Sequence, residues 1–489
     1  MLNLLIFIPI IAALGILLGA RARKTALLAG FAQFLLALLA FLSYDRGHGG
    51  FQFKDQTMLI PEWDLSYHVS ADGLSLVMLL LTGLVTLAAV WVTPPVQRRE
   101  NLFYACVLFI SAGAAGAFAS QDLFFFYAFH ELALIPTFLL IGIWGTGERH
   151  AAAWKITIYL ALGSFVLLIG LIDLLQAIPA NLRTFDMEKL QHLAVNNVIP
   201  AEAQHRPFLL LLIGFGTLVS LFPFHSWAPG AYASAPTPAS MLHAGVLKKF
   251  GLYGLLRLAV PLLPEGAKHW SNLLLALLVA NILYIGLVTI AQRKLDLMLG
   301  YSSVMHMGYI FLGIAAFNII GLSGAALLMF AHGLSIAALF AMAGFIRERS
   351  LSLSFDSLGG LAKQMPFLGL AFGMAAFASI GLPGFGNFAS EVMVFFGAFK
   401  NGSAALGFSE FQLATIGALW GVVISAVYML RAYRAVFFGS SDKAAAGWTD
   451  PTPSGRWPII LLIATLFLAG LAPGYFLSFL KPTIEALLR

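Results

Sequence analysis

The sequence predicts an all-α polytopic membrane protein, and three observations support this fold class. Apolar residues make up 60% of the 489 residues and charged residues only 10%, whereas a soluble domain carries about 25% charged residues. Apolar runs recur along the whole chain, and most approach the roughly 20 residues that a helix needs to cross a bilayer. Two of the runs are interrupted by proline and glycine, as in the broken helices of transporters. The lipid bilayer is therefore the expected surroundings. Nucleic acid is not an expected partner, because the net charge of +6 is small and scattered.

Fourteen apolar segments are expected to form transmembrane helices. They are residues 2–20, 25–43, 72–95, 102–120, 123–145, 152–178, 208–222, 238–263, 271–292, 299–317, 321–346, 367–400 (interrupted), 413–437 and 457–480. No basic region precedes the first segment, so we expect it to be a retained helix and not a signal peptide.

The loops predict an orientation. Lysine and arginine are more numerous in the odd-numbered loops than in the even-numbered ones, which predicts that the odd-numbered loops face the cytoplasm. Both termini are then expected on the outer, periplasmic side of a bacterial inner membrane. The longest outer loops, 43–71 and 179–207, carry most of the acidic loop residues. We expect these loops to pack on a partner or to cap the bundle.

Two helices are expected to be broken. One break lies at Phe222-Pro223-Phe224-His225 and the other at 381–384, Gly-Leu-Pro-Gly, because proline removes a backbone donor and glycine relaxes the chain. Two breaks at related places in two halves predict inverted five-helix repeats, with a simple kink at each proline as the alternative. The expected units are helices 1–3 in residues 1–95, one repeat in 96–263, a second in 264–437, and a loop with helix 14 in 438–489.

Ionisable side chains lie inside the predicted helices. Glu131, the adjacent pair Lys248 and Lys249, and Glu391 all occur within apolar runs. A charged group at membrane depth costs several kcal/mol unless it is paired or neutralised, so such residues are functional candidates. An inward-facing lysine can accept and release protons near neutral pH. The structural alternatives are a packing or capping role for the glutamates and snorkelling of the lysines to the interface.

Four histidines, His225, His243, His306 and His332, lie in or beside apolar runs. Together with the buried lysines and carboxylates they suggest stations on a path for protons, since imidazole titrates near neutrality. Haem ligation by paired histidines remains an alternative. The chain has one cysteine, Cys106, and no Cys-x-x-Cys pattern, so no iron–sulfur or zinc site is expected. The residues by themselves indicate a membrane ion or proton carrier.

Several blocks of sequence resemble the antiporter-like membrane subunits of respiratory complex I, NADH:quinone oxidoreductase. The blocks are DLFFFYAFHELALIPTFLLIGIWG (122–145), FPFHSWAPGAYASAPTPASMLHAGVLKKFGLYGLLR (222–257), KLDLMLGYSSVMHMGYIFLGI (294–314), AHGLSIAALFAMAGFI (331–346) and LPGFGNFASE (382–391). The resemblance covers most of the chain from about 70 to 435. Within the family, this sequence resembles the branch called chain M, because it has a glutamate, Glu391, at a position where chains L and N and the Mrp antiporter subunits usually carry lysine.

The resemblance implies a function and roles for residues. The expected function is proton translocation in the membrane arm of complex I, coupled to quinone reduction, so the chain would be part of a translocase. Glu131 would pair with a lysine on the seventh helix, Lys249 would be the central relay and Glu391 the terminal proton carrier. His225, His306 and His332 would be polar links. No cofactor is expected in this chain, since partner subunits would bind NADH, FMN, the iron–sulfur clusters and quinone. Chains L and N are the expected neighbours. A cation/proton antiporter subunit of the Mrp type, a related hydrogenase membrane subunit, and a scaffold without pumping are the alternatives.

One departure from the family concerns the seventh helix. Leu218 falls where relatives usually carry the lysine, and Ser220 falls where they carry a proline. Glu131 is then protonated, paired with Lys248 or His130, or part of a weakened site. The additional lysine, Lys248, is hypothesised to compensate for the loss at position 218.

Overall fold

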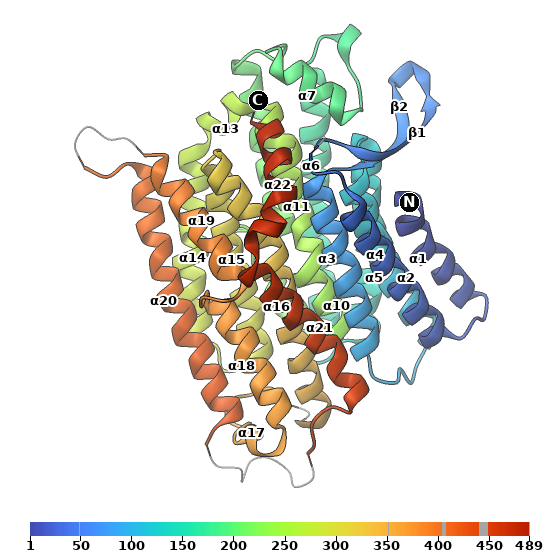
Figure 1. The fold of residues 1–489 in the computed structure, drawn as a ribbon, viewed down its shortest axis with the longest axis vertical. Helices are drawn as coiled ribbons and strands as arrows, with labels where there is room; N and C mark the ends of the chain where they lie inside the picture. Colours follow the sequence, from blue (N-terminus) through green and yellow to red (C-terminus); the bar gives the residue numbers. More distant parts are fainter. Residues whose placement is uncertain (48, 351, 403–406, 440–447, 489) are drawn as a thin grey trace.

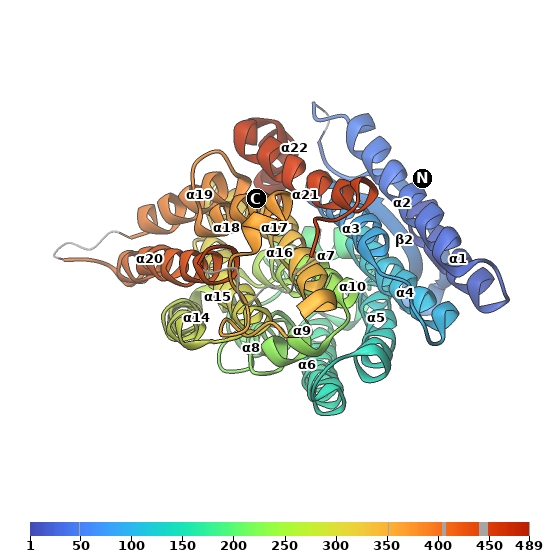
Figure 2. The ribbon, with the colours of Figure 1, turned by 90° about the horizontal axis from the view of Figure 1, so that it is seen from below.

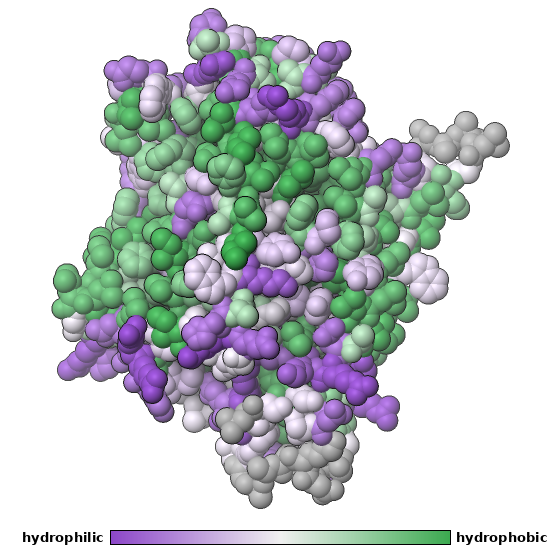
Figure 3. All heavy atoms as spheres, turned by 180° about the vertical axis from the view of Figure 1, so that it is seen from behind, coloured by the Kyte–Doolittle hydropathy of each residue, from purple (hydrophilic) through white to green (hydrophobic). Residues whose placement is uncertain are grey.

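The computed structural model describes residues 1–489 except 48, 351, 403–406, 440–447 and 489. The described chain is a bundle of long, roughly aligned helices with a small hairpin at one end (Figure 1). Ten of the described helices are long and apolar enough to cross a membrane, and α1 (Leu2–Leu17) and α18 (Pro366–Ile380) are shorter apolar helices. On the face that Figure 3 shows, apolar side chains cover much of the middle, with polar patches among them, and polar side chains gather toward both ends. The prediction of a multi-pass helical membrane protein is confirmed.

The first predicted segments coincide with helices. In chain order these are α1, α2 (Ala22–Ser43), α3 (Gly73–Val92), α4 (Glu100–Ala119), α5 (Leu123–Trp144) and α6 (Arg149–Gln176). The middle of the chain forms α7 (Met187–Val195), α8 (His205–Val219), α9 (Trp227–Ser234), α10 (Thr237–Leu242), α11 (Lys248–Gly254), α12 (Val260–Leu262), α13 (Pro264–His269) and α14 (Ser271–Ala291). The remainder forms α15 (Leu295–Ala315), α16 (Ile319–Ser350), α17 (Leu361–Gln364), α18, α19 (Gly386–Lys400), α20 (Glu410–Phe437), α21 (Pro453–Leu471) and α22 (Pro473–Leu487).

The last predicted segment, 457–480, is two helices and not one. α21 ends at Leu471 and α22 begins at Pro473, because the proline has no N–H to continue the ladder of helical hydrogen bonds. α22 then packs against α3 and α16. Figure 1 places both chain ends in the half of the bundle that carries the hairpin and α7.

The expectation of a wholly helical chain is corrected by a two-stranded sheet in the outer loop 43–71. Strands β1 (Gln52–Ile60) and β2 (Leu65–Ala71) pair antiparallel, from Gln52 opposite Ala71 to Ile60 opposite Leu65. Residues 65–71 alternate apolar and polar side chains, which is the period of a strand. Strand β2 is short compared with the apolar segments next to it, so the hydropathy pattern did not indicate it as a separate element.

The two long outer loops pack on each other and on the bundle. His68 Nδ1 of β2 lies 3.1 Å from Asp186 Oδ2 at the start of α7, and Lys189 Nζ lies 2.6 Å from Asp64 Oδ2. Burial opposes ionisation of Asp186, but the hydrogen bonds from His68 and from the Lys189 amide outweigh it, so the pKa of Asp186 lies below its ordinary value. β2 also contacts α1, α3, α4 and α5. These contacts agree with the expectation that the loops cap the bundle.

Helices α3 and α16 form the centre of the bundle. In each of these two helices, the apolar stretch that is long enough to cross a membrane is completely buried. α16 also contacts helices from both halves of the chain, including α3, α10, α15, α19 and α22. Figure 2, a view along the bundle, shows α1 and α2 at one edge and α14 and α20 toward the other. Polar groups on the central helices must therefore find partners inside the protein.

A buried ion pair joins the first central helix to the helix that carries the two lysines. Asp72 caps α3 by accepting a hydrogen bond from the Ser75 amide at 3.0 Å. Arg257 Nη2 donates to the same carboxylate at 2.7 Å, and the two side chains are 1% and 3% exposed. Arg257 is enclosed by protein, and its partner is this cap.

We expect Arg257→Met to destabilise the protein by about 3–5 kcal/mol, because it leaves the carboxylate of Asp72 buried without its cation. Thermal unfolding of the purified protein in detergent measures the effect. Lys268→Met is a matched control, since the ion pair of Lys268 with Glu265 is 68% and 45% exposed and contributes about 0–1 kcal/mol. Equal melting temperatures for the two variants would contradict the importance of the buried pair.

Both predicted helix breaks are present, and they have the same geometry. α8 ends at Ser220 with φ of 74°, and α18 ends at Gly381 with φ of 83°. In each case the next amide, of Leu221 or Leu382, donates to a carbonyl five residues back, at 2.7 and 3.0 Å. This is the Schellman arrangement that terminates a helix. At the first break Asn281 of α14 also accepts a hydrogen bond from the Phe222 amide at 2.5 Å, which satisfies backbone freed by the break.

Candidate functional site

Both lysines lie on α11, which follows a π-helical segment, His243–Leu247. Lys248 is 1% exposed and Lys249 is 0% exposed, so the alternative in which they snorkel to the interface is wrong. The Lys249 ammonium donates to the carbonyl of Ala244, inside the π-helical segment, at 2.7 Å. Wide turns of this kind occur often at functional sites because they redirect side chains and carbonyls. Here the wide turn supplies an acceptor for an amine that is completely buried.

A second contact to Lys249 comes from α16. His332 Nδ1 lies 3.1 Å from Lys249 Nζ. The two helices approach closely because glycines face each other, and a Cβ on Gly333 would lie 2.7 Å from the carbonyl oxygen of Gly245. The pair of glycines therefore determines how near the imidazole comes to the amine.

The contacts continue from His332 to His306 of α15, and we call the row of side chains that begins at Lys249 and passes through these two histidines the polar file. The two imidazole centroids are 5.5 Å apart. His306 Nδ1 and Nε2 each lie 2.8 Å from a carbonyl oxygen, that of Ser302 and that of Ser379 just before the second break. A neutral imidazole has one N–H, so only the protonated ring donates to both carbonyls. This geometry stabilises an extra proton on His306 when one arrives.

A hydroxyl pair lies beside His306. Ser302 Oγ lies 3.5 Å from His306 Nδ1 and 2.9 Å from the hydroxyl of Tyr428, which belongs to α20. The hydroxyls of Tyr428 and of Tyr309 on α15 are close enough to Glu391 for its charge to act on both. The ring centroid of Tyr309 lies 5.6 Å from that of His306.

Glu391 lies on α19, one turn after the helix begins behind the second break. It is 3% exposed, and its Oε1 has no hydrogen-bond partner among the described residues. Asn387, four residues earlier on the same helix, also has both side-chain polar atoms buried and unpaired within the described structure. A buried carboxyl group without a partner is expensive, so Glu391 stays a candidate for a functional role.

Gly381→Ala is expected to disturb this carboxyl group directly. A Cβ at position 381 would lie 2.4 Å from Glu391 Oε2, and the left-handed backbone adds about 1–2 kcal/mol of strain for any L residue. Thermal unfolding and ion translocation by the reconstituted protein measure the two effects. Gly384→Ala is the matched control, because Gly384 has φ of +101° but open space around its Cβ position. If Gly381→Ala and Gly384→Ala translocate ions equally well, the contact between position 381 and Glu391 does not affect function.

Lys248 faces away from Lys249 and toward the first break. Its Nζ lies 3.4 Å from Ser303 Oγ and 5.2 Å from the ring centroid of Tyr232. Lys248 and Leu218 line the same small cavity. His225, in the break itself, is half-buried, and the charge of Lys248 acts on it. Leu218, which replaces the expected lysine, is thus a neighbour in space of Lys248, the additional lysine.

Glu131 does not lie inside the bundle as expected. It is partly buried on α5, and its carboxylate accepts a hydrogen bond from Ser164 Oγ of α6. The structure gives it no ion pair with any described residue, and both ring nitrogens of His130 are without a hydrogen-bond partner there. The proposed pairing of Glu131 with Lys248 or His130 is therefore wrong. The two residues of the His130-Glu131 dipeptide point to different faces, so only His130 faces inward.

The structure thus brings together Lys249, His332 and His306, places Glu391 nearby, and leaves Glu131 at the periphery. Sequence reasoning missed Ser302, Tyr428 and Asn387, which are ordinary residues in apolar helices and carry no sequence signal of their own. Asp173, another acidic residue within an apolar run, forms an ion pair with Arg206 and has a structural explanation.

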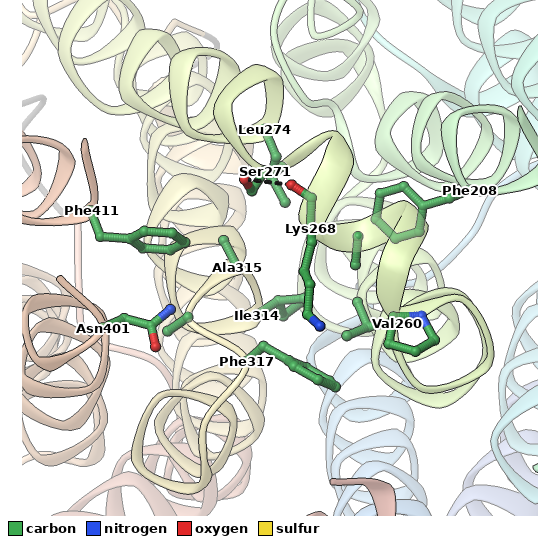
Figure 4. Close-up of a pocket in the computed structure, with 13 residues that line it drawn as sticks. Phe208, Val260, Lys268, Ser271, Leu274, Ile314, Ala315, Phe317, Asn401 and Phe411 are labelled. Carbon is green, nitrogen blue, oxygen red and sulfur yellow. Dashed lines mark hydrogen bonds between the residues drawn. The ribbon is translucent and has the colours of Figure 1, made fainter. Parts of the chain in front are cut away.

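A larger pocket lies apart from these groups. Its volume is about 260 Å³, and Phe208, Lys268, Phe317 and Phe411 are among the residues around it (Figure 4). Lys268 reaches into it from α13, but its amine already pairs with Glu265 at 2.7 Å. The pocket contains none of the predicted site residues, and we assign it no part in the site.

The broken helices and the buried amines, imidazoles and carboxyl group together define a multi-pass membrane protein of the antiporter-like class. A family model described as "NADH:quinone oxidoreductase/Mrp antiporter, TM" matches residues 120–417. The chain belongs to this family. The resemblance to antiporter-like subunits of complex I that the sequence motifs indicated is confirmed.

Similar proteins support this assignment over the whole chain. NAD(P)H-quinone oxidoreductase chain 4 of Gloeobacter violaceus is 34% identical over 100% of this chain and 92% of its own length. Chain 4-2 of Synechocystis is 38% identical over 90% of this chain and 78% of its own length. A chain of respiratory complex I from Thermus thermophilus superposes with a TM-score of 0.90 at 29% identity, covering all of both chains. The Mrp complex of Dietzia shares the fold, with a TM-score of 0.82 at 21% identity over 100% and 99% of the two chains.

Proposed function

We propose that this chain is a proton-translocating subunit in the membrane arm of an NADH:quinone oxidoreductase, in the place of chain M between chains L and N. The single observation that carries the proposal is Lys249, which is completely buried and which, among the described residues, is bound only by a carbonyl and an imidazole. An amine in that setting is unlike a structural cation such as Arg257, which has a carboxylate partner. Proton exchange gives a physical reason for placing it there.

In the proposed mechanism, protons move from Lys249 through His332 and His306 to Glu391. A charge displaced in a neighbouring subunit during quinone reduction alters the proton affinity of Lys249, since a charge at short range shifts a pKa by about 1–3 units. Each step breaks an N–H bond on one group and forms an N–H or O–H bond on the next, so no electron is transferred in this chain. NADH, FMN, the iron–sulfur clusters and quinone would all be bound by partner subunits.

The proposal includes a finer architecture. We place fourteen spans in a bacterial inner membrane, with both termini on the periplasmic side. Two inverted five-helix repeats would cover residues 96–263 and 264–437, between an N-terminal unit at 1–95 and a C-terminal unit at 438–489. The matching Schellman caps at Ser220 and Gly381 support a repeat. Glu131, on the exposed face of α5, would act at the contact with a neighbouring subunit.

Isolation of the affinity-tagged chain from its own membranes tests the assembly. We expect it to co-purify with subunits that carry flavin and iron–sulfur absorbance and to oxidise NADH with quinone as acceptor. The fold is shared with the Mrp complex, so an Mrp-type antiporter is the second candidate. Co-purification with antiporter subunits, without flavin, and sodium/proton exchange that needs no electron donor would overturn the proposal.

A further inference from the structure

The small cavity beside Lys248 brings together three bases, none of which the pathway above uses. His130 of α5 and His243 of the π-helical segment line the cavity with Lys248, and Leu160, Leu218 and Trp227 form much of its apolar wall. Its volume is about 10 Å³, which is room for about one water molecule. Three titratable side chains around a space of this size can exchange a proton directly or through one water.

His130 has no structural need for its nitrogens. Both ring nitrogens are buried and lack a hydrogen-bond partner among the described residues. The ring stacks on Phe250 with centroids 4.0 Å apart and 9° between the planes, a contact that phenylalanine would make equally well. Burying a polar group without a partner costs about 1–3 kcal/mol. A functional requirement for the imidazole accounts for this cost.

The hydrogen bonds of His243 determine its tautomer. Thr137 Oγ1 donates to the Ala133 carbonyl at 2.8 Å, so its single hydrogen is already used. His243 Nε2, 2.8 Å from the same hydroxyl oxygen, must therefore be the donor in that contact. In the neutral ring this leaves Nδ1 as the basic nitrogen, free to take up a proton. His130 and Lys248 lie near enough that a positive charge on either would oppose one on His243.

Lys248 connects the cavity to the rest of the site. Its Nζ lies 3.4 Å from Ser303 Oγ, and the next residue on α11 is Lys249, the first group of the relay, which is near enough for a charge on one amine to repel a charge on the other. Like charges in an apolar cavity repel strongly, so the three bases cannot all carry protons at once. The cluster is suited to holding one excess proton that moves among three sites.

We propose that His130, His243 and Lys248 form a shared proton-loading site that feeds the relay, which makes His130 and His243 further catalytic residues of the proposed translocation. In each transfer an N–H bond on one base breaks and an N–H bond on the next forms, with the net charge of the cluster unchanged. The inference rests on the proposed function and adds a reservoir to it.

The test uses the complete complex reconstituted in liposomes, with protons translocated per electron as the readout. His130→Phe keeps the stacked ring, and His243→Gln keeps an N–H donor toward Thr137, but neither side chain binds a proton. We expect each variant to lower the ratio toward that of Lys249→Met. The double variant should be no worse than the poorer single variant, because the cluster acts as one unit. His269→Phe, at a histidine stacked 3.9 Å from His205 at the outer end, is the matched control with an unchanged ratio.

The outcomes separate the two proposals. If both histidine variants keep the full ratio while Lys249→Met lowers it, the loading site is wrong and the proposed function stands. If Lys249→Met also keeps the full ratio, the proposed function itself fails. A lower ratio that is always accompanied by a melting temperature below that of His269→Phe would assign the histidines a structural role. Infrared difference spectra with ring-labelled histidine give an independent test: a protonation signal during turnover that His243→Gln removes is expected, and its absence overturns the inference.

Discussion

Lys249→Met should remove the proton current carried by this chain while leaving the bundle folded. Methionine is close to lysine in length and leaves the carbonyl of Ala244 to its own helix, so the change removes an amine and not a buried ion pair. Positioned proton-transfer groups contribute about 10²–10⁴-fold to rates, so we expect the current through this chain to fall by about 10²-fold or more. NADH-driven acidification of liposomes, divided by the electrons transferred to quinone, measures the effect.

A matched control for this variant is Lys268→Met, an exposed lysine whose partner is Glu265. It should translocate as the unaltered protein does. If Lys249→Met and Lys268→Met gave the same ratio of protons to electrons, Lys249 would be a structural residue and the relay would be wrong.

The second large effect is expected at the cavity beside the first break. Lys248→Leu removes the only amine among the described residues that line it and should reduce translocation through the chain by about 10²-fold. Leu218 lies on the wall of the same cavity. Adding Leu218→Lys to Lys248→Leu therefore returns an amine to the same space from the seventh predicted segment, and we expect the double variant to recover most of the lost translocation.

Leu218→Lys alone puts a second ammonium into a cavity of about 10 Å³, and like charges there are costly. This variant should be less stable than the double variant in thermal unfolding. A double variant as inactive as Lys248→Leu would contradict compensation, because it would show that the position of the amine matters and not merely its presence in the cavity.

Much of the fold was predictable from composition and spacing. The apolar segments identified the helices, because a chain in lipid must satisfy its backbone within each segment. Both breaks were predicted, because each contains a proline, which lacks the backbone N–H that a continuous helix needs. The break before Pro473 was missed because the apolar pattern continues across it. The hairpin was missed because it is short and lies outside the membrane, where hydropathy gives little information.

The candidate site was predicted by residue type and less well by position. A buried amine or carboxyl group is conspicuous in an apolar sequence, so Lys248, Lys249 and Glu391 were found directly. Glu131 was assigned to the interior because sequence does not reveal which face of α5 is inward, and a rotation of about 100° separates it from His130. The π-helical segment that provides the acceptor for Lys249 depends on tertiary packing at Gly245 and Gly333, and propensity alone does not indicate it.

The central claim is that a buried carboxyl group at the end of the polar file carries protons, and Glu391→Gln tests it most directly. Glutamine has nearly the same shape and remains polar, so packing in α19 should be preserved while proton binding is lost. The decisive measurement is the number of protons translocated per electron by the reconstituted complex. The account predicts a lower ratio for Glu391→Gln at an unchanged melting temperature. A ratio equal to that of the unaltered complex would contradict it.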